Sequence, residues 1–386
     1  MSTMHKYIIG IGAVILVVAS ALTFGRRTAK APQAPEPYVI GVVAPFTGEE
    51  AWYGKLARDV VGMALDEINA SGGVNGHTLE VVFEDGRCNS DDAAAAATKL
   101  VTEHKTQVIL GGFCSGELLG ALSVAVGAKA FVFSAGSSSA DLTGIDPHFA
   151  RNYPGDAARG QALAGVAQTD KHWKKIAIIQ ERRREPAGIS AALSAALAAN
   201  GIGVATETFA ADTDDLSTVV KKLRGQRPDA LFIDAETPAA AERVLQELKA
   251  LSWTVPVLVS ETVASDAAII ERNAAALEGA IVVTFGSDPA NPKFRHLLDA
   301  YRERYQAELP SPHYAQTLYD AVHMIGDAAK SVGNDGETIA TWVRMAQNWQ
   351  GASGAVTIGQ DGDRVGNTAL GVVKGGKLEP YANTQQ

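Results

Sequence analysis

The chain has 386 residues, of which 46% are hydrophobic and 20% are charged, and its formal net charge is −9. This length allows two domains with well-buried cores, and the composition is that of a globular protein. Because an acidic surface is repelled by nucleic acid and by anionic membrane surfaces, we expect neither as a partner.

The N-terminus carries an apolar run from Tyr7 to Gly25. Such a run after a short basic region predicts an export signal, and the small residues Ala19–Ala21 offer a cleavage site. An uncleaved run is just long enough to anchor the chain in a membrane. We therefore expect an export signal or anchor in residues 1–31 and a Pro-rich linker in residues 32–37. Residues 1–31 hold four Lys and Arg and no acidic residue, so the remaining chain has a net charge of −13.

Beyond the linker, apolar runs that predict strands alternate with amphipathic or Ala-rich segments that predict helices. The predicted strands span 38–43, 78–83, 108–110, 130–134, 175–179, 203–209, 230–234, 255–259 and 281–285, with further short strands within 354–374. The predicted helices span 55–69, 90–104, 156–169, 188–199, 216–223, 239–251, 292–308 and 314–331, and we expect Ser90–Asp92 and Asp156 to cap two of them. This alternation predicts an α/β fold with a parallel sheet between helices, and its continuation beyond residue 156 predicts a second lobe.

Two of these strands, Val108–Leu110 and Ala130–Ser134, run directly into turns rich in Gly and Ser. Backbone N–H groups at a following helix start, together with small hydroxyl side chains, form an anion site. Two such turns on neighbouring parallel strands meet in one crevice. The pattern favours a site for a small molecule with a carboxylate or similar group, although the same residues also serve as turn formers and helix caps.

The sequence contains two cysteines, Cys88 and Cys114. In an exported chain this number favours one disulfide, which would stabilise the fold by about 3 kcal/mol. The alternatives are two buried free thiols or, less in keeping with the absence of a nearby His, a metal site.

Enzyme motifs are incomplete in this chain. The run Gly136–Ala140 approaches the G-x-S-x-G pattern of serine hydrolases but lacks its last glycine. The His residues do not have a zinc spacing, and no phosphate-binding Gly motif is present. We therefore expect no enzyme, cofactor or metal ion, with a hydrolase that uses the serine turn as the alternative.

Three stretches, IGVVAPFTGEEAWYG, ALDEINASGGVNGHTLEVVFEDGRC and FSAGSSSADLT, together resemble the periplasmic leucine/isoleucine/valine-binding proteins, which supply solutes to ABC transporters. The similarity extends over residues 38–373. It implies an α/β type I periplasmic binding protein, in which two doubly wound lobes with parallel sheets are joined by three crossovers and hold the ligand in the cleft between them. It also implies a disulfide between the cysteines that match Cys88 and Cys114. The expected lobes are 38–155 with 284–357, and 156–283 with 358–386.

The resemblance implies that the serine-rich turns bind the head group of an amino acid. Ser115 matches a serine that contacts this head group. Gly136 and Ser138 fall where the family offers a backbone group and a hydroxyl to the carboxylate and ammonium, with Ser137 between them.

The resemblance further implies an aromatic cleft wall and an acidic partner for the ligand. Tyr53 matches the aromatic residue, a role that its neighbour Trp52 can take instead. Glu261 resembles the acid that pairs with the α-ammonium of the ligand, a contact that is strong in a closed, dry cleft.

Two acids depart from the family pattern. Glu185 and Glu236 stand where the family often has tyrosines. If both face the cleft beside Glu261, the repulsion among three carboxylates requires protonation or a cationic guest. This leads to the hypothesis of a ligand with more than one positive group, such as a basic amino acid; the alternative is that Glu185 and Glu236 face solvent.

The resemblance thus implies an exported periplasmic solute-binding protein. It would close around an amino acid or a related small molecule and present it to the permease of an ABC transporter. Its contact with the membrane would be through the N-terminal segment or the permease. The alternative retains residues 7–25 as an inner-membrane anchor and uses the same lobes as a ligand-sensing ectodomain or periplasmic regulator.

Overall fold

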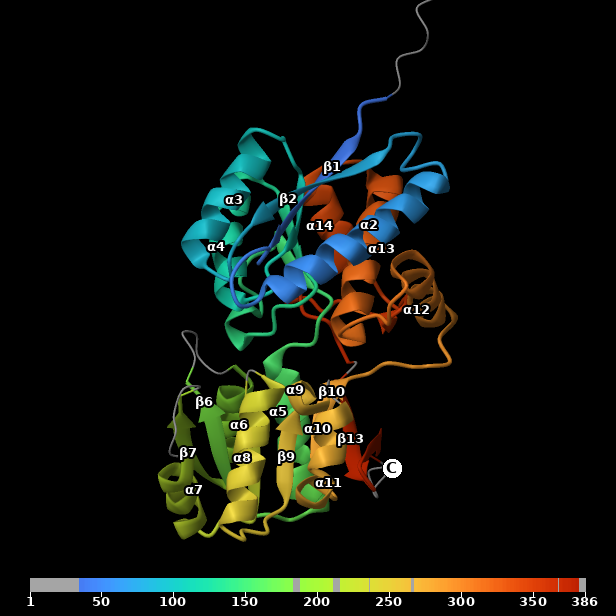
Figure 1. Cartoon of the computed structure of the whole chain (residues 1–386). Coiled ribbons are helices and arrows are strands. Elements are labelled where there is room, and N and C mark those ends of the chain that lie inside the picture. The colour runs from blue at the N-terminus through green and yellow to red at the C-terminus, as the bar shows by residue number, and fades with distance from the viewer. Residues whose placement is uncertain are drawn as a thin grey trace, which may run out of the picture. The chain divides into compact units, whose positions relative to one another are not determined.

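The structure, a computed structural model, describes residues 35–182, 188–210, 216–235, 237–264, 267–366 and 368–381. The predicted export segment, Glu185 and Glu236 lie outside these residues. The chain divides into Met1–Glu36 and Pro37–Gln386, and the fold below is that of the second unit (Figure 1). Among the residues described, no helix is both long and apolar enough to cross a membrane.

The first sheet, as far as the structure describes it, has five parallel strands in the order β2-β1-β3-β4-β5. Their bounds are Tyr38–Ala44 (β1), Leu79–Asp85 (β2), Val108–Gly111 (β3), Phe131–Ser134 (β4) and Phe149–Arg151 (β5). The helices that belong with this sheet are Ala51–Ala70 (α2), Ser90–Thr102 (α3), Ser115–Ala125 (α4), Pro292–Tyr305 (α12), Pro312–Val332 (α13) and Gly336–Arg344 (α14).

Helices cover both faces of this sheet because successive side chains of each strand point to opposite faces. Val42 and Leu110 belong to a buried cluster with residues of α2, α13 and α14. Their neighbours Val43 and Ile109 belong to a second cluster with residues of α3 and α4. Burial of each such side chain stabilises the fold by roughly 1.5–3 kcal/mol, so the unbroken apolar runs are explained by burial on two sides.

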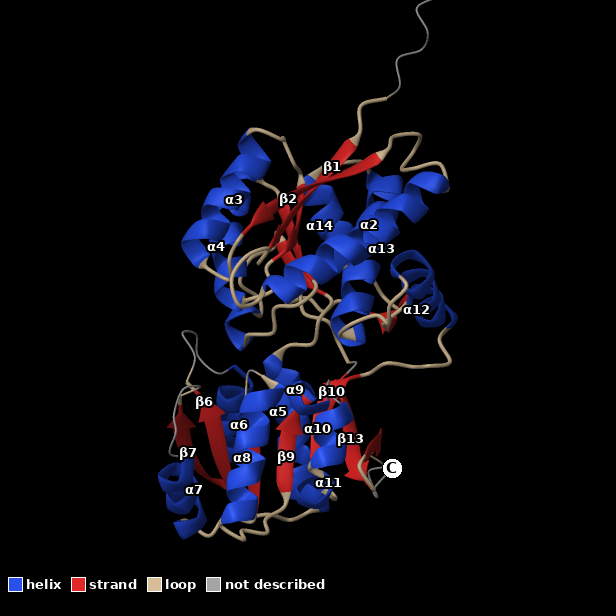
Figure 2. Cartoon of the chain, in the orientation of Figure 1, coloured by secondary structure: helices blue, strands red, loops and turns tan. Residues whose placement is uncertain are grey.

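The second sheet has seven strands within the described residues, in the order β14-β13-β10-β9-β8-β6-β7. The strands are Lys175–Glu181 (β6), Gly203–Phe209 (β7), Ala230–Asp234 (β8), Val257–Ser260 (β9), Ile281–Phe285 (β10), Thr368–Lys374 (β13) and Lys377–Pro380 (β14). Its helices are Asp156–Gly165 (α5), Gly188–Ala199 (α6), Leu216–Gly225 (α7), Pro238–Ala250 (α8), Glu261–Ala264 (α9), Ala267–Arg272 (α10) and Ala274–Leu277 (α11). Figure 2 shows its strands with helices on either side, and one buried cluster joins the strands to α7 and α8 while another joins them to α5 and α6.

This second sheet is mixed, whereas the sequence led us to expect parallel sheets. Strand β13 runs antiparallel to β10, because it enters the sheet beside the carboxyl end of β10, where Thr368 pairs with Phe285. Strand β14 in turn runs antiparallel to β13. The turn between them is Gly375–Gly376, and both residues have positive φ. Two-residue hairpin turns of this kind favour glycine.

The helix starts differ in detail from those predicted. Asn89, not Ser90–Asp92, caps α3, because its side chain accepts hydrogen bonds from the N–H groups of Asp91 and Asp92. Asp156 is the first residue of α5 rather than its cap, and its carboxylate accepts hydrogen bonds from the side chains of Ser138 and Arg159. Helix α5 ends at Gly165 and continues as a π-helix over Val166–Asp170.

Some short elements were not predicted. Among them are β5, the helix α14 and Trp349–Gly351 (β11), which pairs with Gly354–Val356 (β12), a short strand within the predicted range 354–374. Strands of three residues are too short to show a periodicity.

The predicted pairing of Cys88 with Cys114 is confirmed. Their Cα atoms are 5.2 Å apart, and the bond joins the turn after β2 to the residue that precedes α4. It therefore closes a 26-residue separation at the carboxyl edge of the first sheet.

We expect the Cys88→Ser/Cys114→Ser variant to lose about 3 kcal/mol of unfolding free energy, because its unfolded chain is no longer restricted by the crosslink. Urea unfolding followed by circular dichroism measures this loss. Reductant should lower the stability of the wild-type chain by a similar amount and leave the variant unchanged. Equal midpoints for wild type and variant would contradict the expectation.

Candidate functional site

The serine-rich turn after β4 is held against the end of β3 by two buried hydroxyls. Ser134 donates to the carbonyl oxygen of Gly112 at 3.0 Å, and Ser137 donates to the same oxygen at 2.5 Å. The Ser137 hydroxyl therefore joins the two turns to each other. The expected convergence of the turns is present, while a contact of Ser137 with a ligand stays a prediction.

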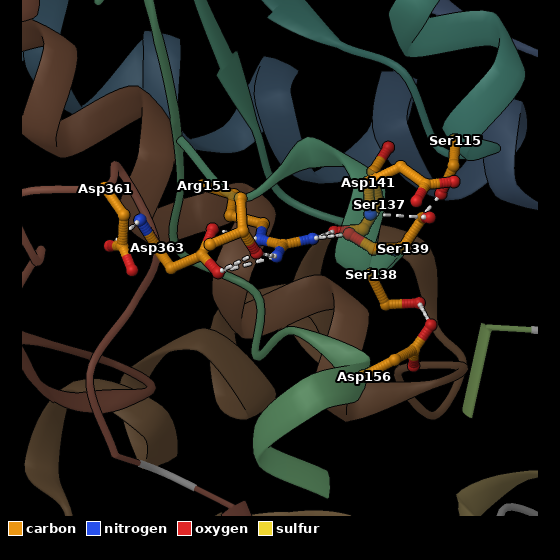
Figure 3. Close-up of polar contacts among 10 residues, drawn as sticks. Ser115, Ser137, Ser138, Ser139, Asp141, Arg151, Asp156, Asp361 and Asp363 are labelled. Carbon is orange, nitrogen blue, oxygen red and sulfur yellow. Dashed lines mark hydrogen bonds and ion pairs between the residues drawn. The ribbon is translucent and has the colours of Figure 1, made fainter. Parts of the chain in front are cut away.

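Ser138 and Ser115 lie on different sides of this turn (Figure 3). The Ser138 hydroxyl donates to Oδ2 of Asp156 at 3.2 Å, and the Asp156 N–H donates to the carbonyl oxygen of Ser138 at 2.7 Å. Ser115 Oγ accepts the N–H of Ser139 at 3.3 Å. The serine turn is thus connected both to α4 and to the start of α5.

Arg151 holds the same turn from β5. Its guanidinium forms a bidentate ion pair with Asp363, with both N–O distances at 2.7 Å, and donates to the carbonyl oxygen of Ser139 at 2.8 Å. The Arg151 side chain is fully buried. Because such fork-shaped pairing fixes orientation as well as distance, the turn has a defined shape. Arg151 and Asp363 were not predicted, since their sequence separation of 212 leaves no local pattern.

Aromatic rings pack beside the turn. Tyr53 is 3% exposed and stacks on Phe113 with ring centroids 4.0 Å apart, whereas Trp52 is 43% exposed. Tyr314 meets Tyr53 edge-on at 5.7 Å and stacks on Tyr153 at 5.1 Å. Of the two alternatives, Tyr53 is therefore the buried ring and Trp52 the exposed one.

Gly136 adjoins this aromatic group. A Cβ at Gly136 would lie 2.9 Å from a ring carbon of Phe113 and 3.1 Å from the Tyr53 hydroxyl oxygen. A larger residue would have to displace these rings. Burial raises the pKa of the Tyr53 phenol well above its usual range, so this hydroxyl stays protonated.

Glu261 is paired within the chain. Its Oε1 accepts the Tyr153 hydroxyl at 3.1 Å, and its Oε2 accepts from Nη2 of Arg159. The other terminal nitrogen of Arg159, Nη1, donates to Oδ1 of Asp156 at 3.0 Å. Asp156, Arg159 and Glu261 are 4%, 6% and 8% exposed, so this ion-pair cluster is almost dry.

Arg159 was not predicted, although the sequence carried a signal for it. A cation in the first turn of a helix is disfavoured by the helix dipole, so Arg159 at that place in the predicted helix indicated an acidic partner. Tyr153 and Tyr314 gave no such signal, because aromatic residues are common in cores. Within the part of the chain that is described, no group of three His, Cys, Asp or Glu side chains could hold a metal ion.

Residues 37–377 match the family of periplasmic binding proteins. The chain belongs to this family. Members of the family are solute-binding proteins rather than enzymes. The predicted α/β fold of a type I periplasmic binding protein is confirmed.

Relatives are similar over most of their length. The amino acid binding protein of Pseudomonas aeruginosa is 26% identical over 340 residues, which are 86% of this chain and 87% of the relative. The Leu/Ile/Val-binding protein of Escherichia coli K12 is 22% identical over 357 residues, covering 92% of this chain and 94% of the relative.

Solved structures have the same fold. The leucine-binding protein LivK of Thermotoga maritima has a TM-score of 0.76 at 24% identity, covering 89% of this chain and 97% of that one. An ABC transporter substrate-binding protein of Desulfitobacterium hafniense, in complex with Leu, has a TM-score of 0.72 at 25% identity, covering 90% of this chain and 100% of that one.

In this periplasmic binding protein a buried acid supports the aromatic group. The carboxylate of Glu117 accepts the N–H groups of Phe113 at 2.9 Å and of Cys88 at 3.2 Å, and its side chain is fully buried. Burial raises the pKa of Glu117 to about 7, although the backbone N–H donors oppose the rise. Glu117 thus titrates near neutral pH and holds Phe113, the ring on which Tyr53 stacks.

The raised pKa of Glu117 predicts that the unfolding free energy falls as the pH rises from 4.5, the ordinary pKa of a Glu carboxyl group, to about 7. In this window the folded chain binds more protons than the unfolded chain, and the loss amounts to at most about 3 kcal/mol. Urea unfolding at a series of pH values should show a flatter profile for Glu117→Gln than for wild type. The exposed Glu337→Gln control should keep the wild-type slope, and an unchanged slope in Glu117→Gln would refute the assignment.

Proposed function

We propose that this chain is the periplasmic substrate-binding protein of an ABC transporter. It binds an amino acid or a related small molecule and delivers it to a permease in the membrane. The family match supports solute binding, and the relatives named above support this ligand class. The proposal includes no catalytic step, in keeping with the family.

The observation that carries the proposal is the set of contacts among the serine turn, the start of α5 and Glu261. Ser138 reaches Asp156, and Tyr153 reaches Glu261. Residues that follow strands of two different sheets thereby share one polar cluster, which a ligand with several polar groups can engage.

In this proposal lobe 1 comprises 38–155 with 284–357, and lobe 2 comprises 156–283 with 358–386. The strand pairing supports the division, because β1–β5 form one sheet and β6–β10 form the other with β13 and β14. The buried cluster that joins α13 to β1 and β3 supports the return of the chain to lobe 1.

The proposed ligand contacts are Ser115, Ser138, Glu261, the backbone of Gly136 and the ring of Tyr53. Glu185 and Glu236 stay predictions as further contacts, since they lie outside the described residues. Ser137 is proposed as a contact through its backbone, because its hydroxyl is used within the turns.

Thermal unfolding of the purified chain against amino acids, small carboxylates, amides and polyamines tests the proposal. A ligand at about 100 times its dissociation constant should add about 2.7 kcal/mol of unfolding free energy, because it binds only the folded chain. Ser138→Ala should reduce this gain. The matched Ser123→Ala variant should retain it, because the Ser123 hydroxyl binds only the Gly120 carbonyl oxygen within α4.

A panel in which no compound raises the unfolding temperature would contradict the proposed ligand classes. Turnover of esters or amides by the wild-type chain, lost in Ser138→Ala, would instead favour the hydrolase.

A further inference from the structure

The charge of Glu261 is balanced by a side chain that is part of the protein. Arg159 lies on the first turn of α5, and Glu261 is the first residue of α9 after β9. Both oxygens of the Glu261 carboxylate already accept a hydrogen bond, one from Arg159 and one from Tyr153. The carboxylate therefore does not require an external cation.

Asp156 is the second acidic partner of Arg159. Asp156 is favoured at the first position of α5 because the helix dipole is positive there, and it accepts the Ser138 hydroxyl as well as Arg159. Burial raises the pKa of Asp156, so its negative charge is held less firmly than that of a solvated carboxylate. Arg159 therefore lies between two carboxylates, those of Asp156 and Glu261.

The other ionisable groups around Arg159 add no positive charge. Burial, together with the charge of Arg159, lowers the pKa of His313 to about 4, so this imidazole is neutral at pH 7. Burial keeps the phenols of Tyr153 and Tyr314 protonated. Asp234 also interacts with Arg159 electrostatically, and it accepts the Ser190 hydroxyl at 2.6 Å.

A ligand ammonium brought up to Glu261 would meet the guanidinium of Arg159. Two like charges a few ångströms apart in a nearly dry site repel strongly. A ligand carboxylate at the serine turn does not need Glu261 as a partner and is attracted by Arg159, while Asp156, which accepts the Ser138 hydroxyl, opposes this attraction.

We infer that Arg159 takes the place of the ligand's α-ammonium as the partner of Glu261, so that the site prefers carboxylic acids that lack an α-ammonium. This inference rests on the proposed function and narrows its ligand class to deaminated acids. It makes Arg159 a specificity-determining residue.

Calorimetric titration of the purified chain with matched pairs tests the inference. The pairs are leucine with isocaproate and phenylalanine with hydrocinnamate, in which the second compound lacks only the amino group, and ornithine is added as a ligand with two ammonium groups. We expect the deaminated member of at least one pair to bind about tenfold or more tightly than its amino acid, since it avoids the charge repulsion.

The Arg159→Gln variant should shift this preference toward the amino acid by about tenfold or more, because the ammonium then gains Glu261 as a partner. Arg159→Lys, which keeps the positive charge, should retain the wild-type order. The comparison of paired ligands on the unmodified chain decides the question even if Arg159→Gln does not fold.

If leucine or phenylalanine binds and neither deaminated compound binds more tightly than its amino acid to wild type, the inference is overturned and the proposed function stays intact. Tight binding of ornithine would also overturn it, in favour of the cationic ligand suggested by Glu185 and Glu236. Binding of none of these compounds would overturn both the inference and the amino acid part of the proposed function.

Discussion

A buried guanidinium must have its charge and its hydrogen-bond donors satisfied by the protein around it, and Arg159 finds both in Asp156 and Glu261. Removal of these groups from water costs several kcal/mol for each ion, so the cluster is stable only when its members stay together. Through it the first turn of α5 is tied to α9, and Asp156 extends the connection to Ser138. The position of the serine turn relative to the second sheet therefore depends on this ion-pair cluster.

The polar groups of the site are attached to the ends of buried strands. Ser134 and Ser137 hold the turn after β4 to the turn after β3, and Arg151 holds it to Asp363. The carboxyl ends of parallel strands are where open α/β sheets place their ligands. A binding protein of this kind needs few side chains to define its ligand, and a single guanidinium within the cluster can change the ligand class.

Local patterns in the sequence predicted much of the fold. The strands Ala230–Asp234 and Ile281–Phe285 match the predicted bounds, because their apolar runs are buried on both faces of a sheet. Gly203–Phe209 also matches, although it lies at the edge of its sheet and only Phe209 in it is buried. The serine turn after β4, and the turn after β3 that contains Cys114, were likewise recognisable from adjacent residues. Pairings across long separations were not: Arg159 and Glu261 are 102 residues apart. Periodicity cannot report which distant side chains meet, so the partner of Glu261 came only from the structure.

The central claim is that Arg159 balances the charge of Glu261 inside the protein, and a double-mutant cycle on unfolding measures this most directly. Each of Arg159→Gln and Glu261→Gln should cost roughly 3–5 kcal/mol, because it leaves a buried charge without its partner. The double variant should cost less than the two single losses together by more than about 1 kcal/mol. The exposed pair Arg302 and Glu308 provides the control, with a coupling of at most about 1 kcal/mol. Additive losses for Arg159 and Glu261 would contradict the claim.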